Sequence, residues 1–552
     1  MWASHRHSGK ALIAALALSL LSSRSATAHS VTVDGSASDW WGVLPPVANL
    51  GRISRNAAHQ GEFVWFDASN DTRTPLASAG LDLTAIRVTA DFSRLYVMAT
   101  LRGAPVMSGA GSPQLQIAMD FDRLPGVGQR AFADGARTQL ANTAAWEYLL
   151  ETGFGSGAGA RVYDASLHPV AAATQEALGS SGVIEVSVPW SALGRPGPPV
   201  TPVRFTIALF ASAANDSVLA SDTTGASNAI DVLSDCDAPG SAPNTSIEVA
   251  DGVVDDWRDL YFSSLGEVYA PILLSQIYYG GGANDEWIEL VNAAPVVVSL
   301  DSFKEGDEET PGGSEGMGQL PATLLAPGRT FVVSRDGSAF FAQHGFHADA
   351  EGTSSDPATP DLTPFPVWAP NIATRIKNGG DELLVLDASN TVLDVFTFHG
   401  GSWPGVVATA ASSPGSSTQR VPWNSDTDDC SVDFVDQPSP SPRSLSSPTA
   451  VGEEGFAPFQ VRGPFPNPVT SSAAFALQWS GGARLRVDCV VLDLAGRRVR
   501  RLDPGAAGIA GTTTFAWDAR DDAGRHVTPG LYFLRVTSPA GSRTVRCAVV
   551  GR

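Results

Sequence analysis

Closely spaced acidic residues are the side chains in this sequence whose types and spacing most suggest chemistry. Asp67 and Asp71 stand four residues apart, and Asp120 and Asp122 follow an apolar run typical of a strand. Calcium takes six to eight oxygen ligands, and clustered carboxylates on loops supply them readily. These two pairs therefore predict structural calcium, with turns in which each carboxylate accepts a backbone hydrogen bond as the alternative. A third acidic group has the same two interpretations: Asp426, Asp428 and Asp429.

Tryptophan is the second residue type that suggests a site in the N-terminal half of the chain. An exposed indole ring stacks on the apolar face of a sugar, so a surface tryptophan forms a platform for a glycan. The candidates for such ligand binding are Trp40, Trp41 and Trp65. The alternative is that these rings fill the core of a sandwich, which we expect for Trp190 because it follows Pro189 at a strand end.

Two short motifs resemble catalytic or metal-binding patterns, and neither has the context that its chemistry needs. Residues 312–316 fit the GxSxG pattern of a hydrolase, which requires a strand-to-helix turn in a parallel sheet. No helical pattern follows, so we interpret the motif as a loop. His344, His347 and Asp349 offer ligands to a metal, but Gly345 weakens the helix that would align them. We therefore predict no catalytic residue.

The charge of the chain excludes one class of partner. The sequence has 552 residues, with 36 Lys and Arg against 57 Asp and Glu, which gives a net charge of −21. Nucleic-acid binding needs a concentrated basic face, so we expect no nucleic-acid partner. The length is too great for one ordinary core and predicts about three or four domains.

The N-terminus has the features of an export signal. Residues 1–28 combine a basic start, an apolar segment at 11–21 and the small residues Ala26-Thr27-Ala28 before the expected cleavage point. The apolar segment is too short to span a bilayer, and no second run of that length follows. We therefore predict a mature chain that is secreted or displayed on the cell surface, without a membrane span.

Cysteine is sparse, which agrees with export but does not indicate a disulfide scaffold. Cys489 and Cys547 lie in the last part of the chain and could pair. Strand alternation places Cys489 inward and Cys547 outward, so two free thiols are the alternative. The other two are Cys236 and Cys430.

Residues 29–266 contain short alternating runs separated by turn residues, which favours a β-sandwich. The expected strands are 86–91, 95–101, 115–120, 183–188 and 203–210, with a closing strand at 246–249. The distinctive motifs are Asp34-Gly35, Asp39-Trp40, Asp82-Leu83-Thr84, Met119-Asp120-Phe121-Asp122 and Val188-Pro189-Trp190. Together they resemble the family 9 carbohydrate-binding modules and the related C-terminal module of glucodextranase. The resemblance implies a glycan or another extracellular component as ligand.

Residues 268–445 are organised around two predicted strand pairs. Residues 271–292 alternate on both sides of a glycine turn at 280–282, and residues 377–398 alternate around Asp387-Ala388-Ser389-Asn390. With Glu286-Trp287-Ile288-Glu289-Leu290, these stretches resemble the lamin tail domain, an immunoglobulin-like sandwich of many bacterial secreted proteins. The resemblance implies a scaffold or adhesion unit.

The C-terminal part begins after a Pro- and Ser-rich linker at 446–455 and occupies 456–552. It has Phe465-Pro466-Asn467-Pro468 at its start, a long alternating strand at 485–496 and a hairpin turn at 517–524. These features resemble the immunoglobulin-like domain of the flagellar hook-capping protein and the C-terminal sorting domains of type IX secretion. The resemblance implies attachment or export through secretion machinery.

The sequence thus predicts an all-β protein of three β-sandwich modules in series, immunoglobulin-like or jelly-roll-like. We call 29–266 the first module, 268–445 the second and 456–552 the third. The predicted function is non-enzymatic binding or adhesion, with the first module recognising a glycan or surface component. No cofactor is predicted apart from structural calcium. The alternative is a metal-assisted extracellular hydrolase built on the loops of residues 300–370 or of the first module.

Overall fold

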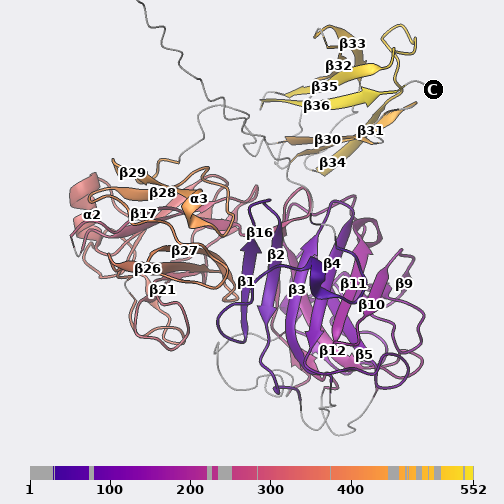
Figure 1. Ribbon diagram of the computed structural model, residues 1–552, viewed down its shortest axis with the longest axis horizontal. Coiled ribbons are helices and arrows are strands. Elements are labelled where there is room, and N and C mark those ends of the chain that lie inside the picture. The colour runs from indigo at the N-terminus through magenta and orange to yellow at the C-terminus, as the bar shows by residue number, and fades with distance from the viewer. Residues whose placement is uncertain are drawn as a thin grey trace, which may run out of the picture.

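The protein is almost entirely β-structure in the computed structural model, which confirms the predicted fold class (Figure 1). Three expectations lie outside the described residues: the signal segment 1–28, the closing strand at 246–249 and the linker 446–455. Among the residues that are described, no helix is long and apolar enough to cross a membrane. The structure describes residues 29, 31–73, 80–219, 227–233, 251–282, 284–372, 374–445, 459–465, 469, 471–479, 488–494, 496–502, 511–538 and 541–550.

The first module is built from two facing sheets, and all five strands expected in its described part are present. One sheet contains, in spatial order, β10 (Gln175–Leu178), β11 (Val183–Pro189), β4 (Arg94–Leu101), β3 (Leu83–Ala90), β2 (Gly61–Phe66) and β1 (Leu50–Arg55). The other contains β15 (Arg258–Phe262), β12 (Val203–Ala211), β5 (Pro113–Asp120), β7 (Tyr148–Glu151), β8 (Arg161–Asp164) and β9 (Pro169–Val170), with β13 (Asp231–Val232) paired to β12. The first residues of the second module add β16 (Val268–Tyr269) to this sheet, beside β15. Shorter elements are η1 (Ala37–Asp39), η2 (Asn142–Ala144), η3 (Trp190–Leu193) and the pair β6 (Gln139–Leu140) and β14 (Val253–Val254).

The second module also has two sheets. The first sheet of the first module continues into it through β27 (Val392–His399), β26 (Gly380–Leu386), β20 (Lys304–Gly306), β21 (Met317–Gln319) and β25 (Thr363–Pro364). A six-stranded sheet contains β24 (Ala350–Glu351), β23 (Thr330–Ser334), β18 (Trp287–Asn292), β17 (Ile272–Tyr278), β28 (Ser417–Arg420) and β29 (Phe434–Gln437). The remaining elements are β19 (Val298–Ser299), β22 (Leu324–Leu325), α2 (Gly337–His344) and α3 (Cys430–Asp433).

Both strand pairs predicted for the second module are confirmed. Strands β17 and β18 pair antiparallel on either side of the glycine turn, and β26 pairs antiparallel with β27. In the second turn the Asp387 carboxylate accepts hydrogen bonds from the backbone of Ser389 and Thr391, at 2.9 and 2.8 Å. Asn390 adopts a left-handed conformation with φ of 60°, which asparagine tolerates better than most residues. Local turn chemistry therefore fixes this hairpin.

The first and second modules share a sheet edge and a core. Strands β1 and β27 meet in a parallel pair at Arg52 and Val392, where the two modules lie side by side (Figure 1). Buried Arg52 donates from Nη2 to Asp428 Oδ2 at 2.8 Å. The same carboxylate oxygen accepts from Ser54 Oγ and from the Arg55 amide. One hydrophobic cluster contains buried side chains of both modules, so they pack as one body.

The third module has a core of its own, formed by side chains between Val469 and Val549. Its two sheets lie apart from the other modules in the ribbon view (Figure 1). One sheet contains β30 (Phe459–Phe465), β31 (Ala473–Trp479) and β34 (Gly511–Trp517). The other contains β33 (Arg498–Leu502), β32 (Asp488–Leu492), β35 (Gly530–Ser538) and β36 (Gly541–Val549).

The two cysteines of the third module do not form a disulfide with each other, and both are buried. The expectation that Cys547 faces outward was therefore wrong. Cys489 lies opposite Val536 and Cys547 lies opposite Tyr532 on the intervening strand β35. Val536 and Tyr532 are four residues apart and so point to the same face of the sheet. Both thiols therefore face the core, on strands that β35 separates.

Candidate functional site: a buried acidic centre and a polar cleft

The first predicted carboxylate pair forms part of a buried acidic centre. Asp67 follows β2, Asp71 lies in the loop beyond it, and Asp231 begins β13. One carboxylate oxygen from each lies within 4.8 Å of the others. The three residues are 0%, 1% and 0% exposed. We call Asp67, Asp71 and Asp231 the acidic centre; the first two were predicted from the sequence, and the third was not.

Hydrogen bonds satisfy only part of the acidic centre. Trp65 Nε1 donates to Asp67 Oδ1 at 3.1 Å, and the Leu83 amide donates to Asp231 Oδ2 at 2.7 Å. The second oxygen of Asp67 and both oxygens of Asp71 have no hydrogen-bond partner. Within the described part of the chain, no ion pair involves Asp67 or Asp71. Leaving buried carboxylate oxygens unpaired costs free energy.

The pKa values of Asp67 and Asp71 reflect burial and the neighbouring carboxylates. Burial, together with repulsion by Asp231 and Asp71, holds the pKa of the Asp67 carboxyl well above its ordinary value. Burial, with added repulsion from Asp82, raises the pKa of Asp71 to about 7. Desolvation and like charges both oppose ionisation, so Asp67 and Asp71 need protons or a cation.

The second predicted pair, Asp120 and Asp122, is joined by Glu147, again a residue that the sequence did not suggest. Oxygens of the three lie within 4.8 Å of one another. Backbone amides already donate to each carboxylate, those of Arg123 to Asp120 and of Phe121 to Glu147 among them. Burial raises the pKa of Asp120 to about 6 and that of Glu147 to about 7. This group therefore combines the turn geometry of the alternative interpretation with a convergence of acids.

The third acidic group forms ion pairs and a helix cap. Asp428 pairs with Arg52, and Asp426 Oδ1 lies 3.4 Å from Arg420 Nη1. Asp429 caps α3 by accepting a hydrogen bond from the Ser431 amide at 3.0 Å. Protein groups thus contact at least one oxygen of each of these carboxylates, which favours the turn interpretation over a calcium site.

The proposed tryptophan platform is wrong for two of its three members. Trp65 is 0% exposed, and the Arg258 guanidinium lies 4.4 Å from the centroid of its ring. Trp40 is 7% exposed and donates from Nε1 to Glu185 Oε1 at 2.8 Å. Only Trp41 is partly exposed. The rings of Trp40 and Trp65 fill the interior and cannot stack on a ligand in this fold.

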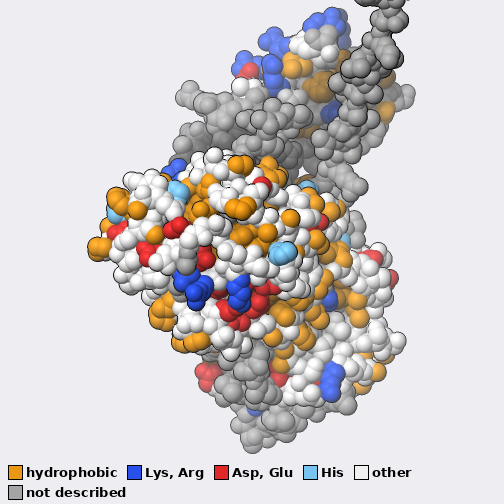
Figure 2. Space-filling view, turned by 60° about the vertical axis from the view of Figure 1, so that its left-hand side comes forward, with side chains coloured by type: hydrophobic (Ala, Val, Ile, Leu, Met, Phe, Trp, Pro, Cys, Tyr) orange, Lys and Arg blue, Asp and Glu red, His pale blue; other side chains and the backbone are white. Residues whose placement is uncertain are grey.

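The second module carries an open polar cleft of about 940 Å³. Three acidic and three basic side chains line it: Glu286, Asp307, Glu315, Arg335, Arg375 and Lys377. Figure 2 shows acidic and basic side chains gathered side by side on the face that this module turns forward. Equal numbers of opposite charges give the cleft no net preference for an anion or a cation.

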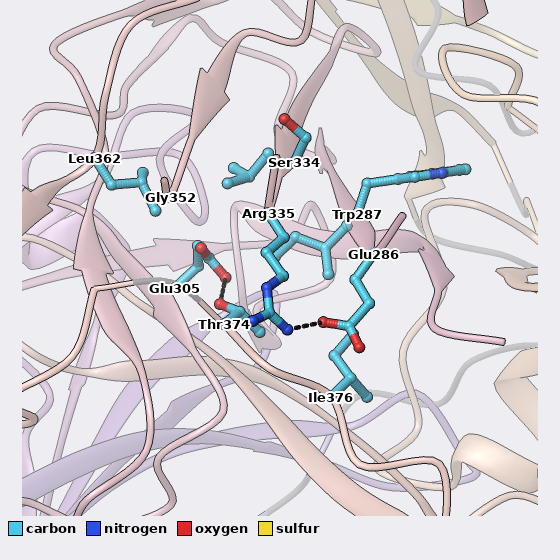
Figure 3. A pocket seen from close by; sticks show the side chains of 11 residues that line it. Glu286, Trp287, Glu305, Ser334, Arg335, Gly352, Leu362, Thr374 and Ile376 are labelled. Atoms are coloured by element: carbon cyan, nitrogen blue, oxygen red, sulfur yellow. Dashed lines mark hydrogen bonds and ion pairs between the residues drawn. The ribbon is translucent and has the colours of Figure 1, made fainter. Parts of the chain in front are cut away.

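Ion pairs and backbone hydrogen bonds hold the walls of the cleft. Arg335 Nη1 lies 3.1 Å from Glu286 Oε2, and the two side chains point toward each other (Figure 3). The Asp307 carboxylate accepts from the backbone of Gly316 and of Arg375, both at 2.8 Å. Lys377 pairs with Glu315. The guanidinium of Arg375 is exposed and has no partner among the described residues, so it is available to a ligand.

A narrow extension of the cleft reaches into the module. Its volume is about 10 Å³, enough for roughly one water molecule. Glu305 lies there with Oε2 accepting a hydrogen bond from Thr374 Oγ1 at 3.0 Å, while Oε1 has no partner (Figure 3). Burial, with repulsion from Asp307, raises the pKa of Glu305 to about 8. This glutamate therefore keeps its proton at neutral pH.

The GxSxG motif lies at the rim of the cleft, in the loop between the antiparallel strands β20 and β21. No helix follows Ser314, so the strand-to-helix elbow of a hydrolase is not formed and the loop interpretation is confirmed. Acidic side chains gather beside this loop in two overlapping groups, Glu308 with Glu309 and Glu315, and Glu309 with Asp381 and Glu382.

The third module is similar to a known domain family. Residues 470–542 match the family model of the FlgD Ig-like domain. The match confirms the predicted resemblance of this module to the immunoglobulin-like domain of the flagellar hook-capping protein. It covers a small part of the chain, and none of the curated proteins compared with the sequence matches it.

Solved structures give only weak likenesses to the whole chain. A DUF4876 family protein from Bacteroides thetaiotaomicron is 14% identical over 48% of this chain and 89% of its own, with a TM-score of 0.25. Latent PorU of Porphyromonas gingivalis is 12% identical over 85% of this chain and 34% of its own, with a TM-score of 0.16. PorZ, a surface component of the type IX secretion system of the same organism, is 13% identical over 84% of this chain and 59% of its own, with a TM-score of 0.13. At these TM-scores none of them defines the fold of this chain, and the family 9 and lamin tail resemblances stay predictions.

Proposed function

We propose that this protein is an exported, non-catalytic binding protein whose third module attaches it to the cell surface or takes part in its export. The observation that carries the proposal is the match of residues 470–542 to an immunoglobulin-like domain family. That domain has its own core and follows a linker predicted from composition, as expected for a separable attachment unit. The predicted signal segment supplies the route out of the cytoplasm.

The ligand site of this proposal is the polar cleft of the second module. Its lining mixes carboxylates, guanidinium groups and the amides of Asn371 and Asn378 without a net charge. Such side chains form paired hydrogen bonds with neighbouring hydroxyl groups. We therefore propose a neutral, hydroxyl-rich ligand, an extracellular glycan, and place it in this cleft because the tryptophans of the first module are largely buried.

Deleting residues 456–552 is expected to change where the protein resides. In the native host, the truncated chain should remain in the periplasm or be released from the surface, because the attachment unit is gone. Fractionation with an antibody to the first module measures the location. The first two modules share a separate core, so the truncated chain should keep its thermal unfolding transition. An unchanged location in a folded truncated chain would contradict the attachment role.

Replacing Arg375 by alanine is expected to weaken glycan binding by about tenfold, which corresponds to one lost hydrogen-bonding group with a charge. The side chain is exposed, and alanine keeps the backbone amide that donates to Asp307. A glycan array followed by calorimetry with the best glycan measures the effect. The matched control is Arg329→Ala, an exposed arginine of the same module outside the cleft lining. Equal loss in both variants would remove the cleft as the site.

Metal-assisted hydrolysis is a second candidate, favoured by the acidic groups that border the cleft loop. Glu309 belongs to both groups, and closely placed carboxylates are suitable ligands for a catalytic divalent ion. Chromogenic glycoside, ester and phosphate substrates distinguish the candidates. Turnover that depends on an added divalent metal and is lost in Glu309→Gln would favour the hydrolase, whereas glycan binding without turnover favours the binding protein.

A further inference from the structure

We infer that Asp67, Asp71 and Asp231 form a calcium site that ties the two sheets of the first module together. Calcium–oxygen bonds are about 2.3–2.6 Å long, so one ion reaches oxygens that lie up to about 4.8 Å apart. The carboxylate oxygens of the acidic centre meet this limit without rearrangement. This inference concerns the stability of the first module and is independent of the ligand proposed for the cleft.

The need for a cation follows from the unpaired oxygens. Asp71 is 1% exposed, and neither of its carboxylate oxygens has a hydrogen-bond partner. Asp67 is fully buried and has one oxygen without a partner. An ion at the meeting point of the three carboxylates would give Asp67 and Asp71 a partner that the protein does not supply.

The ligand set selects a hard cation. All three ligands are carboxylates, whereas zinc sites are typically built with His or Cys. Magnesium demands near-ideal octahedral geometry and keeps several waters, which a fully buried cluster does not accommodate. Calcium tolerates irregular arrangements of oxygens and is the ion that extracellular modules bind in the range of about 0.1–1 mM. These arguments favour calcium for an exported protein.

The position of the acidic centre indicates what the ion does. Asp67 and Asp71 follow β2 of the eleven-stranded sheet, while Asp231 begins β13, which pairs with β12 of the eight-stranded sheet. The Asp67 amide also donates to Thr84 O of β3 at 3.0 Å, which fixes the start of the loop. An ion at this point bonds to both sheets. Its removal leaves the carboxyl groups facing each other across the sandwich, where they must take up protons or repel one another.

Calcium titration of the full-length mature chain, stripped with EDTA, tests the site. Calorimetry with CaCl₂ gives the number and affinity of sites, and terbium luminescence excited through tryptophan reports their position. Trp65 donates to Asp67 and is close enough to sensitise bound terbium. We expect Asp71→Asn to lower the calcium affinity of this one site at least about tenfold, so that calorimetry counts one site fewer. Wild-type protein in calcium at about one hundred times its Kd should melt about 3 °C higher than stripped protein.

The control is Asp301→Asn, an exposed aspartate of the second module, which should bind calcium as wild type does. Asn is isosteric with Asp and removes a buried charge, so Asp71→Asn should fold. If it does not, Trp65→Phe decides the case by lowering terbium luminescence while leaving the number of calcium sites unchanged. The inference is overturned if wild-type protein binds no calcium at about 10 mM, or if folded Asp71→Asn keeps the wild-type number and affinity of sites.

Discussion

Replacing Arg420 by alanine is expected to lower the free energy of unfolding of the first two modules by about 3–5 kcal/mol. Arg420 is 1% exposed and is the shared partner of three buried carboxylates, Asp394, Asp426 and Asp433. Its Nη2 lies 2.6 Å from Asp394 Oδ2, and Nε donates to Leu274 O at 2.8 Å. Alanine would leave three buried carboxylates without a cation.

Urea unfolding followed by tryptophan fluorescence measures this loss. The conservative variant Arg420→Lys keeps the charge but loses the planar set of guanidinium N–H donors. Its free energy of unfolding should therefore lie between those of Arg420→Ala and wild type. Exposed Arg329→Ala should change the free energy by less than about 0.5 kcal/mol. If Arg420→Ala does not fold, the graded loss in Arg420→Lys still reports the effect. Equal unfolding midpoints for Arg420→Lys and wild type would contradict this role.

Patterns that depend on neighbouring residues were predictable from the sequence. The hairpin of β17 and β18 needs only period-2 alternation around glycines, and the turn at 387–390 needs only Asp and Asn in their usual places. The match of the third module to a known family is also encoded in a continuous stretch. In each case the decisive interactions span few residues.

Two of the three members of the acidic centre were predictable, and strand pairing supplies the third. Asp67 and Asp71 are close in sequence, but Asp231 reaches them through pairing with β12 and through the amide of Leu83, 148 residues earlier. Glu147 joins Asp120 in the same way, across the antiparallel pair of β5 and β7. An acidic residue at the start of a short strand gives no signal of its own in a single sequence.

Burial of the tryptophans also depends on distant elements. Alternation shows that Trp65 lies on one face of β2, but not whether that face is covered. The cover comes from Arg258 on β15, a strand of the opposite sheet. The prediction that Trp65 forms an exposed platform for a ligand is wrong because both faces of β2 are buried. A strand at the centre of a wide sheet packed on both sides does not display its side chains.

The junction of the first two modules shows the same limit. Turn-rich sequence near residue 266 favours a boundary, yet the strands on either side contribute to one core. Arg52 and Asp428 close the junction, and neither residue differs in type from many exposed arginines and aspartates. Only their place on β1 and beside β27 makes the pair buried. Sequence periodicity therefore defined the strands, while the contacts between modules came from the three-dimensional arrangement.

A strong pH dependence of stability is expected from Glu305, and Glu305→Gln should remove it. Burial raises the pKa of this carboxyl to about 8 from an ordinary value of 4.5. A raised pKa means that the folded chain holds a proton that the unfolded chain has lost. The stability from Glu305 is therefore complete below about pH 4.5, falls as pH rises, and is lost by about pH 8.

The variant carries a neutral amide at every pH, so wild type and Glu305→Gln should differ least in acid. Relative to wild type, the variant should gain on the order of 3 kcal/mol in unfolding free energy between pH 5 and about pH 9. The carboxyls of Asp307 and Glu286 line the same region and titrate in both proteins, so the difference reports Glu305. Urea unfolding at several pH values measures it, with Asp301→Asn as the exposed control. Parallel pH profiles for wild type and Glu305→Gln would show that Glu305 is ionised in the folded protein, and that the narrow end of the cleft is open to water.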